Sequence, residues 1–305
     1  MIYTVTGKVA KTDFGNACAH EHICVVSNDM KHTFGKNWLD EEKLINLAAK
    51  VLKGAGFGLF VDGTPCDLGR DVNILKRVSE QSGVKIVAST GFYYYPNLFS
   101  SGRTDKELAK WILKECTKGM EGTGIKPGIL KCASQGAEIF EDAKKRLSAV
   151  AMVQAETGLP MYVHSSLSGE VEEKIKILLA SGAAPQKIII GHCGLKPDVD
   201  YLESILNMGC YISMDQNHCS GRKAEIPKAL TELCQKGYAN QICLSSDGCI
   251  YNDFAGDENT GIEKTPEEHI KLLNYQQNNI YPHFGGSHED WNKMMGQNIV
   301  DILDV

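Results

Sequence analysis

The chain has 305 residues, of which 43% are hydrophobic and 23% are charged, and its formal net charge at pH 7 is -6. These values are typical of a soluble globular protein, and the acidic balance argues against a protein whose main role is to bind nucleic acid. No apolar run reaches the roughly 18 residues that a membrane-spanning helix needs, and the N-terminus lacks the apolar core of a signal peptide. We therefore expect a cytoplasmic protein with neither a nucleic-acid partner nor a membrane partner.

The first fifteen residues, MIYTVTGKVAKTDFG, alternate in polarity as a β-hairpin does. After them, a short apolar run, a polar turn and an amphipathic helical segment recur along the chain, and several helical segments end in Gly before the next run. A polar loop at 249–265 and helical segments at 266–280 and 288–303 follow the last run. The eight runs expected as strands are 16–26, 56–65, 84–92, 128–134, 159–166, 187–194, 209–216 and 241–248.

Strands that alternate with helices indicate βαβ units and a parallel sheet. Eight such strands in one undivided chain favour an α/β fold of the (β/α)8 TIM barrel type over a doubly wound sheet. The lack of a G-x-G-x-x-G motif after an early strand also weakens a dinucleotide-binding interpretation. We expect one domain over 1–305, with an N-terminal hairpin (1–15), the barrel (16–248) and a final part (249–305) that holds the loop after strand eight and the C-terminal helices.

Lys131 lies inside the fourth expected strand, in the apolar stretch GILKCAS. Lysine is almost never fully buried unless its charge is compensated. Either the side chain reaches the surface, or it is held inside for a chemical reason.

Other polar residues follow the same pattern, because the active site of a parallel barrel lies at the carboxyl ends of its strands. His20 and His22 are two apart on the first strand and so share a face, with Glu21 on the other. His164, His192 and Asp247 come at the ends of the fifth, sixth and eighth strands. A lone histidine there is more often structural, but imidazole together with carboxylate suits zinc and other divalent metals. Four histidines exceed the three protein ligands of one catalytic zinc, which indicates a two-metal site.

The order HEH, ILK, VHS, GHC and SSD on successive strands resembles the amidohydrolase superfamily. More narrowly, AHEHICV, GILKCAS, YVHSS, IIIGHCG and SSDGC resemble the phosphotriesterase family, including its lactonase-like and homology members. DLGRD at 67–71 and TGFYYYP at 90–96 fit the same family. The resemblance extends over nearly the whole chain.

This resemblance implies a binuclear metal centre, with zinc as the first expectation and manganese, cobalt or iron as alternatives. His20, His22 and Asp247 would hold one metal, and His164 and His192 the other. Lys131 would be N6-carboxylated and bridge the two, together with a hydroxide. Burial and two nearby cations would favour the neutral amine of Lys131, which can add carbon dioxide. Asp247 is the expected proton acceptor during attack.

The expected reaction is hydrolysis of a lactone or a carboxylic ester, with side activity toward phosphotriesters. Tyr93, at the end of the third strand, resembles a family tyrosine beside the lactone site. Gln216 stands where lactonase-like members often carry Arg, which weakens the case for acyl-homoserine lactones. Arg222 and Lys223, after strand seven, could bind a phosphate or carboxylate, so a phosphorylated sugar lactone is the first expectation. His218 is a further candidate for the pocket.

Other interpretations stay open. The protein could be a phosphotriesterase, or an amidohydrolase that acts on a cyclic amide or an N-acyl amino acid. Lys131 could be the Schiff-base lysine of a barrel aldolase, although this leaves the histidines and Asp247 unexplained. A non-catalytic metal-binding barrel is a further alternative, although such a protein would not need Asp247 as a proton acceptor. The partner expected is a small-molecule substrate, and a homodimer is possible.

Overall fold

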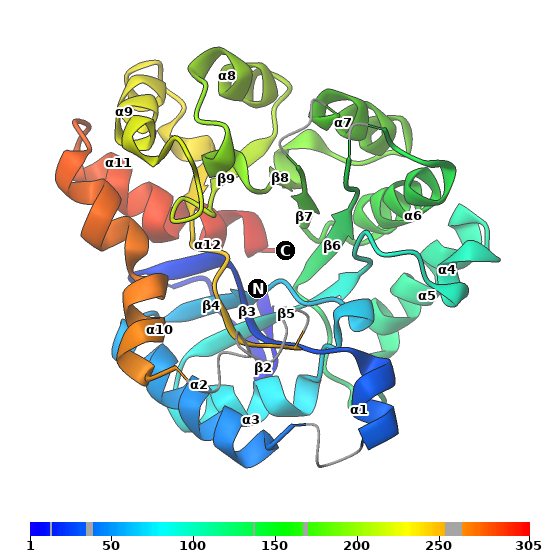
Figure 1. The fold of residues 1–305 in the computed structure, drawn as a ribbon. Helices are drawn as coiled ribbons and strands as arrows, with labels where there is room; N and C mark the ends of the chain where they lie inside the picture. The colour runs from blue at the N-terminus through cyan, green and yellow to red at the C-terminus, as the bar shows by residue number, and fades with distance from the viewer. Residues whose placement is uncertain (13, 35–38, 137, 167–169, 254–263) are drawn as a thin grey trace.

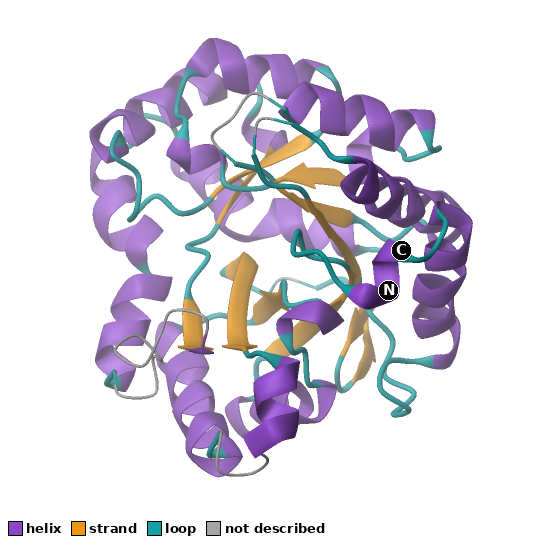
Figure 2. Ribbon diagram, turned by 45° about the vertical axis from the view of Figure 1, so that its right-hand side comes forward, coloured by secondary structure: helices purple, strands orange, loops and turns teal. Residues whose placement is uncertain are grey.

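A computed structural model describes residues 1–12, 14–34, 39–136, 138–166, 170–253 and 264–305. Nine strands pair in parallel in the order β10-β9-β8-β7-β6-β5-β4-β3-β11, and helices surround this curled sheet (Figures 1 and 2). The predicted (β/α)8 barrel architecture is confirmed. The strands of the sheet are β3 (Ala17–Val25), β4 (Leu59–Asp62), β5 (Lys85–Gly91), β6 (Ile129–Ala133), β7 (Met161–His164), β8 (Ile188–Ile190), β9 (Tyr211–Met214), β10 (Ile242–Leu244) and β11 (Cys249–Asn252).

Most of the helices lie in the predicted segments between the strands, and the C-terminal helices follow the sheet. Three of them, α2, α3 and α6, end at glycines in the left-handed conformation, Gly56, Gly83 and Gly158, as the sequence indicated. Within the described residues, no helix is both long and apolar enough to cross a membrane. The α-helices are α1 (Asn28–Phe34), α2 (Glu41–Ala55), α3 (Val72–Ser82), α4 (Leu98–Ser101), α5 (Asp105–Lys118), α6 (Glu141–Thr157), α7 (Val171–Ala180), α8 (Val199–Asn207), α9 (Ile226–Gln235), α10 (Pro266–Leu273), α11 (His288–Asn292) and α12 (Asn298–Leu303).

The predicted eighth strand is divided into two pieces. β10 pairs with β9, whereas β11 pairs with β3 at the opposite edge of the sheet, so the interrupted strand joins the two edges. The backbone N–H groups of Ser246 and Gly248, in the interruption, donate to the buried Glu21 carboxylate instead of to a neighbouring strand. The prediction that the loop begins at 249 was wrong, because residues 249–252 form β11; residues 254–263 of that loop lie outside the described residues.

At the end of the barrel where the strands begin, apolar side chains fill the interior and the chain termini cover it. The predicted N-terminal hairpin is confirmed, with β1 (Ile2–Thr4) antiparallel to β2 (Gly7–Val9), and Val5 N donates to Ile86 O at 2.9 Å. The N-terminal ammonium lies 2.8 Å from the Val305 carbonyl oxygen, so the two ends of the chain are side by side (Figure 1). In one buried cluster, side chains of the strands pack against helix α12. The cluster contains Ile2, Ala17, Ala19, Leu59, Val61, Val87, Ile129, Tyr162, Ile189, Cys243, Ile299, Val300, Ile302 and Leu303.

Candidate metal centre

Strand periodicity directs the candidate ligands into the barrel. Lys131 and His164 follow the interior residues Ile129 and Tyr162 by two positions, so they share the inward face at the carboxyl ends of β6 and β7. On β3 the pairing with β4 shifts register between Cys18 and Glu21. A shift of this kind re-aims side chains next to it.

The two β3 histidines both face the other candidate ligands. Ala17 and Ala19 belong to the interior cluster, so strict alternation would place Glu21 inside with them. The register shift instead lets His20 and His22 face the interior, where the His20 ring stacks on Tyr162 with centroids 3.8 Å apart.

The six predicted ligands meet at this end of the barrel. Lys131 Nζ lies 2.6 Å from His20 Nε2, and His192 Nε2 lies 2.7 Å from His164 Nδ1. Asp247 Oδ1 is 3.3 Å from both His20 Nδ1 and His22 Nε2. The six side chains come from five parts of the chain and are close enough together to share one or two ions.

Burial favours the neutral form of three candidate donors, Lys131, His20 and His164, whereas at His192 the carboxylates of Asp215 and Asp247 outweigh burial and raise the pKa. Burial lowers the pKa of Lys131 to about 8, although Asp247 and Asp215 oppose the shift. Burial, with the nearby Lys131 ammonium, lowers the pKa of His20 to about 3, and burial also holds the pKa of His164 well below 6.5. Neutral imidazole and neutral amine carry the lone pairs that metals or carbon dioxide require.

The donor set fits a pair of divalent metal ions. Two imidazole nitrogens that face each other at 2.7 Å can share only one proton, whereas a cation between them would satisfy both lone pairs. His20 Nδ1 is buried and has no hydrogen-bond partner among the described residues. The group His20, His22 and Asp247 has the size of a metal site.

Asp215, after β9, is a buried residue that the sequence did not single out as part of the site. It accepts hydrogen bonds from the backbone N–H of His192 at 2.9 Å and from the Tyr162 hydroxyl, and its Oδ1 is 2.8 Å from His192 Nδ1. A carboxylate on the outer nitrogen of a ligating histidine fixes its tautomer. The position of Asp215 at the end of a predicted strand, directly before Gln216, could have identified it as a site residue.

Thr64 and Asp62, after and at the end of β4, are further polar residues that sequence reasoning missed. Thr64 Oγ1 lies 2.7 Å from His22 Nδ1, and Thr64 N donates to Asp62 Oδ1 at 3.0 Å. The second strand therefore orients His22 although it supplies no candidate ligand.

Backbone strain is concentrated at this site. Among the described residues other than glycine, four have a positive φ, and three of these are His192 at 61°, Gln216 at 53° and Asp247 at 55°. They follow β8, β9 and β10. Left-handed backbone at such residues costs of the order of 1–3 kcal/mol each and is found mainly at functional sites, where surrounding contacts hold it.

A cleft of about 520 Å³ opens onto the candidate metal ligands His164 and His192. Two of the predicted substrate residues, Tyr93 and Gln216, line it. Gln216 Nε2 also donates to Asp247 Oδ2 at 2.6 Å, and the Tyr93 ring lies 5.2 Å from the His164 ring. Tyr93 is fixed by its backbone N–H, which donates to the Asp67 carboxylate.

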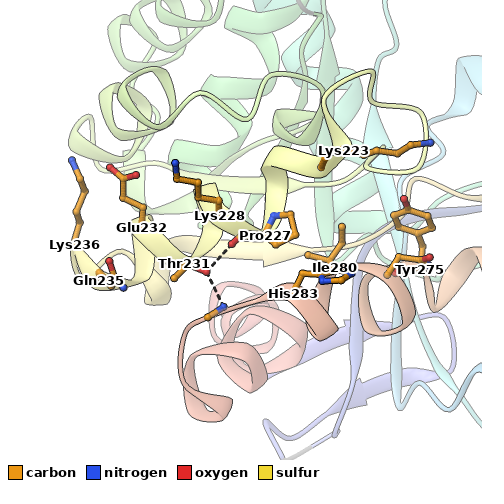
Figure 3. A pocket seen from close by; sticks show the side chains of 13 residues that line it. Lys223, Pro227, Lys228, Thr231, Glu232, Gln235, Lys236, Tyr275, Ile280 and His283 are labelled. Atoms are coloured by element: carbon orange, nitrogen blue, oxygen red, sulfur yellow. Dashed lines mark hydrogen bonds between the residues drawn. The ribbon is translucent and has the colours of Figure 1, made fainter.

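The other three predicted substrate residues do not line this cleft. His218 packs against Tyr275, with ring centroids 5.9 Å apart, and the exposed Arg222 forms an ion pair with Glu225. Lys223 lines a separate groove of about 1050 Å³ beside α9, which Figure 3 shows with Tyr275 at the same end. None of the three is among the described residues that line the metal cleft.

The fold and this site define a class of protein: a (β/α)8 barrel with a candidate histidine, lysine and aspartate metal centre at the carboxyl ends of its strands. The model of the phosphotriesterase family matches residues 1–298, and the chain belongs to this family. The resemblance noted from the strand-end motifs is therefore confirmed.

Individual proteins that are similar to this chain support the same assignment. The chain is 29% identical over 256 residues to an aryldialkylphosphatase of Saccharolobus solfataricus, covering 81% of each protein. It is 27% identical over 291 residues to an N-acetyltaurine hydrolase of Mus musculus, covering 81% of this chain and 83% of the relative. The structure of the phosphotriesterase from Mycobacterium tuberculosis superposes with a TM-score of 0.87 at 26% identity, covering 99% of this chain and 98% of the other. These names indicate a hydrolase.

Proposed function

We propose that the protein is a binuclear metal-dependent hydrolase that cleaves a lactone or a carboxylic ester. The observation that carries this proposal is the convergence of four imidazoles, one carboxylate and one buried lysine at the carboxyl end of the barrel. The proposed metal ligands are His20, His22, Lys131, His164, His192 and Asp247. Zinc is the metal expected first.

Lys131 is proposed to act as a carbamate. Its side chain is 1% exposed and its pKa is lowered to about 8, so a large fraction of the amine is neutral near physiological pH. The neutral nitrogen attacks carbon dioxide, a new N–C bond forms, and one N–H proton is lost to solvent. The product would carry two carboxylate oxygens where an ammonium has no acceptor, and these oxygens would be available as metal ligands.

Two bound metals would supply an activated water and polarise the carbonyl of the substrate. Asp247 would take the proton of the attacking water, and the position of its Oδ1 beside His20 and His22 supports this role. Gln216 holds the other oxygen, Oδ2, and so fixes the plane of the carboxylate. Tyr93 forms a wall of the cleft and would orient the acyl or alcohol part of the substrate.

The phosphorylated sugar lactone stays a prediction. The positions of Arg222 and Lys223 do not support it, because the first pairs with Glu225 and the second lines the separate groove. The described lining of the cleft contains no Arg or Lys, so we favour an uncharged lactone or ester.

The test is reconstitution of the metal-free protein with zinc, manganese, cobalt or iron in bicarbonate, followed by a panel of lactones, esters, phosphorylated sugar lactones and phosphotriesters. We expect hydrolysis that depends on metal and is strongest with an uncharged lactone or ester. Lys131→Met is the matched variant, and it should lose metal and activity together. A metal-free protein that is active and is trapped by borohydride would instead support the aldolase interpretation.

A second candidate is hydrolysis of an N-acyl amide, which is favoured by the relatives named N-acetyltaurine hydrolase. The same activated water can attack an amide carbonyl, but the leaving amine must then gain a proton. N-acyl amino acids and N-acetyltaurine therefore belong in the panel. The homodimer and the cytoplasmic location stay predictions, and light scattering of the purified chain tests the first.

A further inference from the structure

The His164 imidazole is held between two groups of different character. Its Nδ1 lies 2.7 Å from His192 Nε2, and its Nε2 lies 2.8 Å from the side-chain oxygen of Gln135. A neutral imidazole has one donor nitrogen and one acceptor nitrogen. An amide oxygen can only accept, so this contact requires the proton on Nε2 and leaves the lone pair of Nδ1 directed at His192. That lone pair is the one a metal between the two rings would use.

The backbones that carry Gln135 and His164 are fastened together by Lys174. This fully buried lysine donates to Ser134 O at 3.2 Å, to His164 O at 3.1 Å and to Glu170 Oε1 at 3.0 Å. The ends of β6 and β7 are thereby held in one arrangement, and the Gln135 side chain starts from a fixed position beside the histidine ring.

Packing does not explain this contact. Gln135 is exposed and forms part of the wall between the metal cleft and a neighbouring cavity of about 650 Å³. An exposed side chain gains little stabilisation from burial. The contact between the Gln135 amide oxygen and the ring nitrogen of His164 is therefore a directional hydrogen bond. Partners of this kind on metal-ligating histidines set ring orientation and ligand basicity.

We propose that Gln135 is a positioning residue that fixes His164 as the Nε2–H tautomer and thereby strengthens the metal position shared by His164 and His192. This inference rests on the proposed binuclear metal centre. Gln135 neither binds the metal nor touches the reacting bond, and it acts only through the histidine.

The experiment compares Gln135→Leu, which removes the acceptor, with Gln135→Glu, which keeps it. Glu138→Gln, an exposed position in the same loop, is the control. Metal equivalents and affinities are measured on the full chain by competition with a chelator, without substrate. We expect Gln135→Leu to bind one of its two metals about 10–100-fold more weakly, with the other unchanged. Gln135→Glu and the control should bind both metals as tightly as the unmodified protein or more tightly.

A second measurement reads the tautomer directly. Long-range ¹⁵N–¹H spectra of the metal-free protein, assigned with His164→Gln, should show His164 protonated at Nε2 in the unmodified protein and in Gln135→Glu, but a mixture in Gln135→Leu. Unchanged affinities in Gln135→Leu, or a Gln135→Glu variant as weak as Gln135→Leu, would overturn the proposal. An unmodified protein that binds fewer than two metals would count against the proposed function, while the tautomer would still decide the role of Gln135.

Discussion

Carboxylation of Lys131 can be tested by rebuilding the metal-free protein at different pH values under the same pressure of ¹³C-labelled carbon dioxide. Lowering the pKa from 10.5 to about 8 disfavours the ammonium by about 3 kcal/mol. At pH 8 about half of the amine is then neutral, against roughly 0.3% for an ordinary lysine, which is about a 160-fold difference. At pH 6 the neutral fraction falls to about 1%, so rebuilding should be about 50-fold slower than at pH 8.

Two readouts follow this reaction. The carbamate carbon gives a new ¹³C resonance that should be absent from Lys131→Met, and the metal content should rise in parallel with it. If protein rebuilt without carbon dioxide regains full metal content and activity, the carbamate proposal fails. A rebuilding rate that does not change between pH 6 and pH 8 would show that the neutral amine is not the reactive form.

Three further predictions concern single side chains. Asp247→Asn should lower kcat/KM by about 10²–10⁴-fold at saturating metal, and an unchanged rate would exclude Asp247 as the proton acceptor. Lys174→Met should lower the free energy of unfolding, measured in urea, by about 3–5 kcal/mol because it removes the cation that is paired with the buried Glu170 carboxylate, and adding Glu170→Gln should recover part of the loss. Burial raises the pKa of Asp67 to about 6, so its stabilising contribution is complete below the unfolded value near 3.8 and is lost as the pH rises through 6. The free energy of unfolding of Asp67→Asn, taken relative to that of the unmodified protein, should therefore be about 1.4 kcal/mol higher at pH 8 than at pH 5. An equal difference at both pH values would contradict this assignment.

The sequence was sufficient for the architecture and for most of the candidate metal centre. Apolar runs that alternate with amphipathic helices predict the barrel, since a continuous apolar run and a helical period of 3.6 residues are both local signals. The position of Lys131 within GILKCAS, and of His164 after MYV, then places both at carboxyl strand ends. The side-chain period of two is enough to direct them inward once the apolar neighbours face the core.

The substrate side of the site was less accessible to sequence reasoning. Arg222 and Lys223 were expected near the substrate because they follow strand seven. In the structure Arg222 turns to Glu225, three residues on, and Lys223 lines the separate groove beside α9. A loop position restricts where a backbone passes but leaves the direction of a long, flexible side chain open.

The barrel therefore follows from local patterns in the sequence, whereas the finer arrangement of the site depends on contacts between distant residues. The Glu21 carboxylate receives the N–H groups of Ser246 and Gly248, more than 220 residues away, and so marks the interruption of the eighth strand that carries Asp247. Asp215 contacts His192 in a similar way, between the ends of the neighbouring strands β8 and β9. Pairing of this kind has no periodicity to reveal it, because it depends on which strand ends the closed sheet brings together.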